Sequence, residues 1–222
     1  MKDTLQAADG HTLSAYIAQP TGTPKGAVIV VQEIFGVNSH IRSVADGYAA
    51  AGYLAIAPAL FDRVQRDYEA GYSQDEIGQG IDIMKQLDFD NALLDIDAAL
   101  NKVPAELKSG VVGYCFGGSV AWLAAQRLSR LSASVCYYGG AIPNFVDEPL
   151  RCPTMLQFGN LDGSLPLDKA QAVAQMYPDA ISHFYEADHG FNCDQRGSYN
   201  QEAAQLALSR TLEFLARHLA AN

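Results

Sequence analysis

The segment that most constrains the fold is G-Y-C-F-G-G at residues 113–118. A short apolar run with β-branched residues, 109–112, precedes it and is typical of a buried strand. An alanine-rich segment, 119–128, follows it and is typical of a helix. Cys115 is therefore expected at a strand-to-helix corner, with one glycine two residues before it and another two residues after it.

Such a corner indicates a specific chemistry. The pattern matches the G-x-S-x-G nucleophile elbow, with a thiol in place of the hydroxyl. The glycines are needed because the nucleophile is held in a strained conformation and its neighbours must pass close by without a Cβ. The start of the helix favours negative charge, which promotes a Cys115 thiolate and stabilises an oxyanion. The alternative is that Cys115 is a small buried hydrophobe beside glycines that serve only helix–sheet packing.

The composition excludes several classes of protein. A formal net charge of −10 argues against nucleic acid or an anionic membrane as a partner. Any selectivity for an anionic substrate must then come from local arginines. The apolar runs are too short to cross a bilayer, and residues 1–6 lack the apolar core of a signal peptide. These features predict a cytoplasmic protein that is not an integral membrane protein.

The cysteines do not suggest a structural framework. They are Cys115, Cys136, Cys152 and Cys193. Because they show no C-x-x-C spacing, neither a zinc knuckle nor a set of disulfides is predicted. His189, Cys193 and Asp188 likewise offer no second cluster at ligand spacing, so no metal is expected.

Predicted strands and helices alternate along the chain. The predicted strands are 4–8, 13–19, 27–31, 53–57, 109–112, 133–138, 154–158 and 182–186. The predicted helices are 38–51, 90–102, 119–128, 167–176 and 200–219. Asp9-Gly10 between the first two strands indicates an antiparallel hairpin. The alternation predicts one α/β domain over residues 1–222, a mostly parallel sheet with helices on both faces.

The region 60–80 shows a weaker pattern, with Arg63, Arg66 and three glycines. We interpret it as a mobile excursion over an active site, and a merely solvated loop fits about as well.

Two loops hold the residues that a nucleophile at Cys115 needs. In an α/β-hydrolase sheet the catalytic groups follow the order nucleophile, acid, base, each at the carboxyl end of a strand. Asp162 lies in the turn-rich loop after strand 154–158, and His189 follows strand 182–186. His189 would accept the thiol proton, and Asp162 would fix the imidazole tautomer.

Other candidates for these roles fit less well. Four histidines lie in elements that suit structural roles: His11, His40, His183 and His218. Asp188 is adjacent to His189, so the two side chains should point apart, and Asp168 is typical of an exposed helix start. The structural alternative is that Asp162 shapes a turn and that His189 is a surface histidine.

The oxyanion hole and a gating carboxylate complete the predicted site. The backbone N–H of Phe116, next to the nucleophile, is the first expected donor, and that of Ile34, after strand 27–31, is the second. Glu33 ends a buried strand, where an unpaired carboxylate is costly. Glu33 could hydrogen-bond the Cys115 thiol, or it could be a structural carboxylate bonded to a nearby arginine or to the backbone.

With these residues in view, the chain resembles the dienelactone hydrolase family (carboxymethylenebutenolidase), a branch of the α/β-hydrolases. The resemblance rests on Q-E-I-F-G at 32–36, G-Y-C-F-G-G at 113–118, Y-Y-G at 137–139, G-N-L-D at 159–162 and H-G-F at 189–191. It implies an α/β-hydrolase fold and opening of dienelactones to maleylacetate during breakdown of chlorinated aromatics. It also implies no cofactor and a monomer or small homo-oligomer. By resemblance, Cys115, Asp162 and His189 form the triad and Glu33 gates the thiol.

One departure concerns the substrate. Members of that family hold a substrate carboxylate with two arginines, one in the excursion and one four residues past the catalytic histidine. Here Cys193 occupies the latter position, with Arg196 the nearest arginine, and Gln79 and Ile83 stand where an arginine and a tyrosine are expected. The candidate substrate-binding residues are Arg63, Arg66, Arg196 and Tyr138.

The sequence therefore predicts a cysteine-dependent hydrolase of small lactones or esters that works through an acyl-cysteine intermediate. Two alternatives stay open at this point. One is a thioesterase or small-peptide hydrolase with the same triad. The other is a non-catalytic binding or redox protein with a hydrolase fold.

Overall fold

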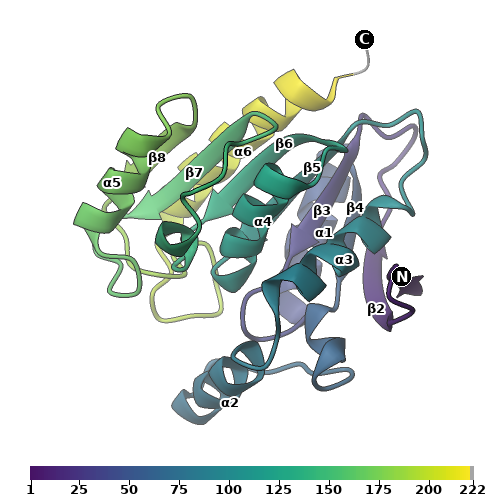
Figure 1. The fold of residues 1–222 in the computed structure, drawn as a ribbon, viewed down its shortest axis with the longest axis horizontal. Coiled ribbons are helices and arrows are strands. Elements are labelled where there is room, and N and C mark those ends of the chain that lie inside the picture. Colours follow the sequence, from purple (N-terminus) through teal and green to yellow (C-terminus); the bar gives the residue numbers. More distant parts are fainter. Residues whose placement is uncertain (221–222) are drawn as a thin grey trace.

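A computed structural model describes residues 1–220 of the chain (Figure 1). Within these residues, eight strands form one sheet in the order β1-β2-β4-β3-β5-β6-β7-β8. The strands are β1 Lys2–Gln6, β2 Thr12–Ala18, β3 Ala27–Val31, β4 Leu54–Pro58, β5 Ser109–Tyr114, β6 Leu131–Tyr137, β7 Thr154–Gly159 and β8 Ile181–Tyr185. The β1–β2 and β2–β4 pairs are antiparallel, and the other pairs are parallel. The predicted mostly parallel sheet with an N-terminal antiparallel hairpin is confirmed.

Helices cover both faces of this sheet. They are α1 Ser39–Ala50, α2 Gln74–Met84, α3 Phe89–Leu100, α4 Phe116–Arg127, α5 Leu167–Met176 and α6 Gln201–Leu219, with short 3-10 helices η1 Leu60–Arg63 and η2 Ile142–Asn144. Figure 1 shows α3 and α4 in front of the sheet and α6 behind it. A helix layer on each side explains why the central strands are apolar along their whole length rather than alternating.

The buried strand β3 shows how the two layers divide the core. Val28 and Val30 join the cluster that contains buried residues of α1 and α6. Ile29 and Val31 point the other way and join the cluster that contains residues of α3, α4 and α5. Because side chains alternate along a strand, five consecutive apolar residues serve two separate cores.

Most element boundaries lie within three residues of the predicted ones, and the caps explain two of them. The Asn38 side chain accepts a hydrogen bond of 3.2 Å from the backbone N–H of Ile41 and begins α1, which ends before Gly52 at a φ of +98°. The Asn200 side chain begins α6 in the same way, with an N–H···O distance of 3.1 Å to Ala203.

The expectation of an irregular excursion over 60–80 is wrong in part. The segment contains η1 and most of α2, which begins with a capping box formed by Ser73 and Glu76. Within α2 only Gly80 and Ile83 are buried, and glycines interrupt the helical pattern. Gly78 and Gly80 lower the helix propensity of this segment, which concealed the helix in the sequence. Figure 1 shows α2 at the periphery, away from the sheet.

Across residues 1–220, the helices are either too short or too polar to cross a membrane.

Candidate active site

Cys115 lies at the corner between β5 and α4, in a backbone conformation with φ +56° and ψ −118°. A non-glycine residue with positive φ is uncommon and costs free energy, so the surrounding contacts must hold it in place. Its backbone N–H donates to the carbonyl of Tyr137 at 3.0 Å. A Cβ at Gly113 would overlap the carbonyl of Gly117, which shows why the predicted glycine is needed.

The structure brings the three predicted triad residues together from the carboxyl ends of β5, β7 and β8. The His189 Nε2 atom lies 3.0 Å from the Cys115 Sγ atom, and the His189 Nδ1 atom lies 2.8 Å from the Asp162 Oδ2 atom. The second Asp162 oxygen accepts hydrogen bonds from the backbone N–H groups of Ser164 at 2.7 Å and Leu165 at 3.0 Å. These bonds fix the carboxylate, which in turn orients the imidazole.

The charges around His189 favour its protonated form. Burial by itself lowers the pKa of His189, but the Cys115 sulfur and the hydrogen-bonded Asp162 carboxylate outweigh it and raise the pKa to about 10. A protonated imidazole stabilises negative charge that develops on an adjacent sulfur, and a thiolate is the reactive form of a cysteine.

A cavity of about 570 Å³ opens beside this group, and Cys115 and His189 both line it. This volume lies within the range of small-molecule sites. One wall comes from α2, whose aliphatic side chains Ile77, Ile81 and Met84 line the cavity. These three residues were not among the predicted site residues, although their spacing of four and three places them on one helical face.

Both predicted oxyanion-hole residues also line the cavity. Phe116 is the first residue of α4, so its backbone N–H has no acceptor within the helix. Ile34 lies in the loop after β3, beside the start of α4. A Cβ at Gly117 would overlap the carbonyls at the end of β3, so this glycine allows the close approach of loop and helix.

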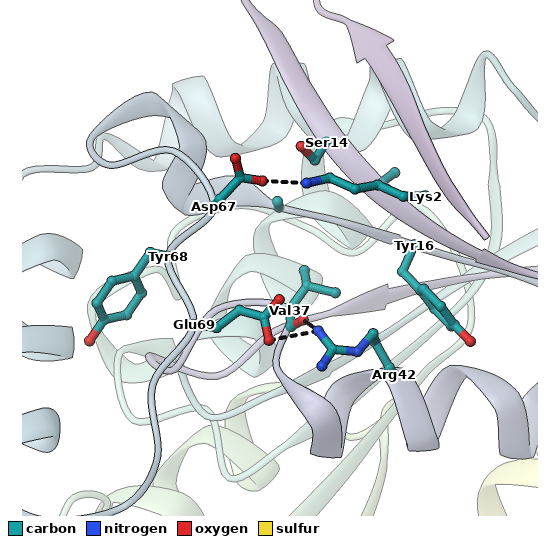
Figure 2. A pocket seen from close by; sticks show the side chains of 10 residues that line it. Lys2, Ser14, Tyr16, Val37, Arg42, Asp67, Tyr68 and Glu69 are labelled. Atoms are coloured by element: carbon teal, nitrogen blue, oxygen red, sulfur yellow. Dashed lines mark hydrogen bonds and ion pairs between the residues drawn. The ribbon is translucent and has the colours of Figure 1, made fainter.

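A second, smaller cavity of about 110 Å³ lies beside β2 and the start of α1 (Figure 2). Ion pairs between Lys2 and Asp67 and between Arg42 and Glu69 cross it. The residues that line it do not include the triad. Because all four side chains are substantially exposed, these pairs contribute little to stability.

Comparisons with known proteins agree with the resemblance seen in the sequence. A model of the "Dienelactone hydrolase family" matches residues 13–219. The chain belongs to that family. A carboxymethylenebutenolidase of Pseudomonas putida is 31% identical over 96% of this chain and 94% of its own length. A relative from Synechocystis sp. is 35% identical over 92% of each chain.

A solved structure of a candidate dienelactone hydrolase from Klebsiella pneumoniae has the same fold, with a TM-score of 0.82 and 31% identity over 98% of both chains. The predicted α/β-hydrolase fold is thereby confirmed. So is the predicted class, a hydrolase of ester and lactone bonds, which is the class of this family.

Two of the predicted substrate-binding arginines lie away from the cavity. Arg63 binds Asp95 through two hydrogen bonds, of 2.7 and 2.8 Å, and also binds Asp9 at 2.8 Å. Arg66 donates to the backbone carbonyl of Thr12 at 2.7 Å. Both side chains turn toward the N-terminal hairpin, where they tie η1 and the following turn to the sheet edge. We therefore do not retain Arg63 and Arg66 as substrate-binding candidates.

Arg196 is the predicted arginine that does line the cavity. Its Nη1 atom lies 3.3 Å from the Glu33 Oε1 atom, and its guanidinium lies over the Phe35 ring, 5.4 Å from the centroid. Glu33 is 1% exposed. Of the two interpretations given to Glu33, the carboxylate bonded to an arginine matches this geometry, while the Cys115 sulfur is hydrogen-bonded to His189.

Tyr138 packs behind the triad rather than lining the cavity. Its ring meets the His189 ring edge to face, with centroids 5.1 Å apart, and the residue is fully buried. It is therefore placed to position the imidazole. Asp188, which we judged a poor partner for the imidazole, accepts the backbone N–H of His189 at 2.6 Å instead.

Proposed function

We propose that this protein is a cysteine-dependent hydrolase that opens small lactones and cleaves small esters through an acyl-cysteine intermediate. The observation that carries the proposal is the continuous series of short contacts from the Cys115 Sγ atom through His189 to Asp162. A thiol beside an imidazole that is oriented by a carboxylate is the arrangement that activates a cysteine nucleophile.

The reaction follows from these positions. The Cys115 thiol gives its proton to the His189 Nε2 atom, and the sulfur attacks the substrate carbonyl carbon. The negative charge on the carbonyl oxygen is stabilised by the backbone N–H groups of Phe116 and Ile34, an interaction worth about 10²–10³ in rate per donor. The C–O bond of the ester breaks, and the leaving oxygen takes the proton from His189. In a lactone this oxygen stays attached to the acyl group.

Water completes the cycle. His189 takes a proton from a water molecule, the resulting hydroxide attacks the thioester carbon, and the Cys115 sulfur leaves. The product is a free carboxylic acid, and the enzyme returns to its starting state.

The lining of the cavity supports a small and mainly apolar substrate. The aliphatic wall from α2 lines the same cavity as Cys115 and His189, and Arg196 and Lys85 are cationic groups of the lining. A substrate with an apolar body and one anionic end fits this distribution. An anionic end would compete with Glu33 for Arg196, which would free the carboxylate to turn toward Cys115. In this way Glu33 would gate the thiol.

The decisive experiment is turnover of a panel of lactones, aryl esters, thioesters and short peptides by the Cys115→Ala variant. Loss of the nucleophile should lower lactone and ester turnover by about 10⁴-fold or more. Cys152→Ser, which alters another buried thiol outside the cavity, is the matched control and should retain activity. Undiminished turnover in Cys115→Ala would refute the proposal.

The acyl intermediate is tested separately. Mixing the wild type with an activated ester should add the acyl mass to the tryptic peptide that contains Cys115. Persistent absence of any adduct, together with absence of turnover, would favour the binding or redox protein considered above. Preferred turnover of thioesters or peptides in the panel would favour the other alternative.

The role of Arg196 has its own test. Arg196→Lys keeps the positive charge near Glu33 but loses the planar donor pair. The KM of the Arg196→Lys enzyme should rise for a lactone that carries a carboxylate and stay near the wild-type value for a neutral ester. Equal effects on both substrates would exclude Arg196 as the group that binds the anionic end.

The gating role of Glu33 is tested by alkylation. Glu33→Gln removes one negative charge beside Arg196 while keeping the side-chain shape. The pH profile of Cys115 alkylation by iodoacetamide should shift in this variant. An unchanged profile would remove Glu33 from that role.

A further inference from the structure

Three buried side chains of ligand-forming type meet behind Glu33. They are Glu33 in the loop after β3, His40 in the first turn of α1 and Cys193 in the loop after β8. One carboxylate oxygen, one ring nitrogen and the sulfur all lie within 4.8 Å of one another. The three residues are 1%, 3% and 0% exposed. Their meeting was not predictable from the sequence, because they come from distant parts of the chain.

Two atoms of this group lack partners. Among the described residues, the Glu33 Oε2 atom and the His40 Nε2 atom are buried and have no hydrogen-bond partner. Leaving a buried polar atom unpaired costs about 1–3 kcal/mol, and such atoms are rare in native proteins. The two unpaired atoms belong to residues whose ligand atoms lie within 4.8 Å of each other and of the Cys193 sulfur, so a bound ion would satisfy both.

His40 is oriented as a ligand. Its Nδ1 atom lies 3.4 Å from the Asp194 carboxylate. The carboxylate lies beside Nδ1 and the buried Nε2 atom has no hydrogen-bond partner, which resembles metal-binding histidines that have a carboxylate beside the ring nitrogen that does not bind the ion. Of the two ring nitrogens, Nε2 is therefore the one available to an ion.

We propose that Glu33, His40 and Cys193 bind a divalent transition-metal ion of the zinc class. Nitrogen, sulfur and carboxylate oxygen are the ligands that zinc takes in proteins, and three protein ligands leave a fourth position for water. Glu33 keeps its other oxygen toward Arg196.

Access from solvent fits this site. His40 and Asp194 line a surface cavity of about 240 Å³, so the nitrogen ligand can be reached from solvent. Because a cysteine must lose its proton to bind an ion, the affinity of the site should rise with pH.

The experiment measures cobalt binding to the full-length chain, with Cys115→Ala as the starting variant because Cys115 and His189 could themselves hold a soft ion. Titration with Co²⁺ should produce a near-ultraviolet thiolate-to-metal absorption that saturates at one ion per chain. Zn²⁺ should abolish the absorption by competition. Because the readout is spectroscopic, it does not depend on the proposed function, and the two can fail separately.

Three further variants in the same background assign the ligands. Cys193→Ser should remove the absorption, and Cys152→Ser, at a buried thiol outside the group, should leave it unchanged. Asp194→Asn alters an exposed side chain that only orients His40, and it should weaken binding by about 10–100-fold. This variant keeps the test informative if replacing a buried ligand prevents folding.

Two results would overturn the proposal. One is absence of the cobalt absorption, which would mean that water alone satisfies the two unpaired atoms. The other is an absorption that Cys193→Ser leaves at full strength, which would place the ion elsewhere. An affinity unchanged by Asp194→Asn would count against His40 as the nitrogen ligand.

Discussion

Arg63 offers a sharp test of the difference between a substrate-binding and a structural arginine. Its side chain is 10% exposed and makes two hydrogen bonds to Asp95, whose side chain is fully buried. Replacing Arg63 with Ala leaves the Asp95 charge buried without a partner. Breaking a buried pair from one side typically costs about 3–5 kcal/mol, a large fraction of the roughly 5–15 kcal/mol that stabilises a domain. In a chain of this length that cost lowers the Tm by roughly 6–20 °C.

The measurement is urea unfolding at neutral pH, followed by ester turnover well below the Tm. Arg66→Ala is the matched control, because the nearby Arg66 is exposed and should change stability by only about 0.5 kcal/mol. The Arg63→Ala protein that remains folded should keep wild-type kcat and KM. The double variant Arg63→Met with Asp95→Leu removes both charges and should recover most of the lost stability.

The pH dependence supplies a second readout of the same reasoning. Burial raises the pKa of Asp95 even in the presence of Arg63, and without Arg63 the pKa must rise further. A carboxyl whose pKa is raised by folding favours the folded state while it is protonated, and this contribution is lost as the pH rises through the folded pKa. The destabilisation by Arg63→Ala should therefore grow from acidic to neutral pH. A KM increase without loss of stability would refute the reasoning and return Arg63 to the substrate site.

Three further predictions concern the elbow, the triad and the N-terminal hairpin. Gly113→Ala forces a Cβ onto the backbone of the following helix and should cost about 1–3 kcal/mol or more, measured by the urea midpoint, with loss of ester turnover. Cys115→Ala removes the charge that helps raise the pKa of His189, which should fall below about 10 in an NMR titration; an unchanged pKa would contradict that cause. The hydrogen bond from Arg63 lowers the pKa of Asp9 from 3.8 to about 2. The ionised Asp9 carboxylate therefore stabilises the folded protein above pH 3.8, and this stabilisation is lost as the pH falls from 3.8 to about 2. Asp9→Asn should therefore lose less stability than the wild type between those two pH values.

The elements that carry strong local signals were predictable. The apolar run of β3 and the capped helices α1 and α6 follow from periodicity and cap residues. The order of Cys115, Asp162 and His189 along the chain was enough to predict their meeting. Each follows a parallel strand, and the carboxyl ends of such strands lie at one edge of the sheet.

Features that depend on distant pairing were not predictable. The sequence does not reveal that Arg63 turns to Asp95 while Arg196 turns to Glu33, because both choices are made by packing between separate segments. For the same reason His40, assigned a structural place at a helix start, was not connected with Cys193. The helix α2 was missed because Gly78 and Gly80 lower the helix propensity of its segment, although Ile77, Ile81 and Met84 recur at helical spacing.

Because α2 lies at the periphery, the cavity wall that it forms is separate from the groups proposed to break bonds. The groups proposed to break bonds lie on loops anchored by the central sheet, where a small shift would be costly. The cavity wall formed by Ile77, Ile81 and Met84 belongs to α2, a peripheral helix with only two buried residues. Mutations at Ile77, Ile81 or Met84 can therefore change which substrates fit the cavity without disturbing the backbone at Cys115.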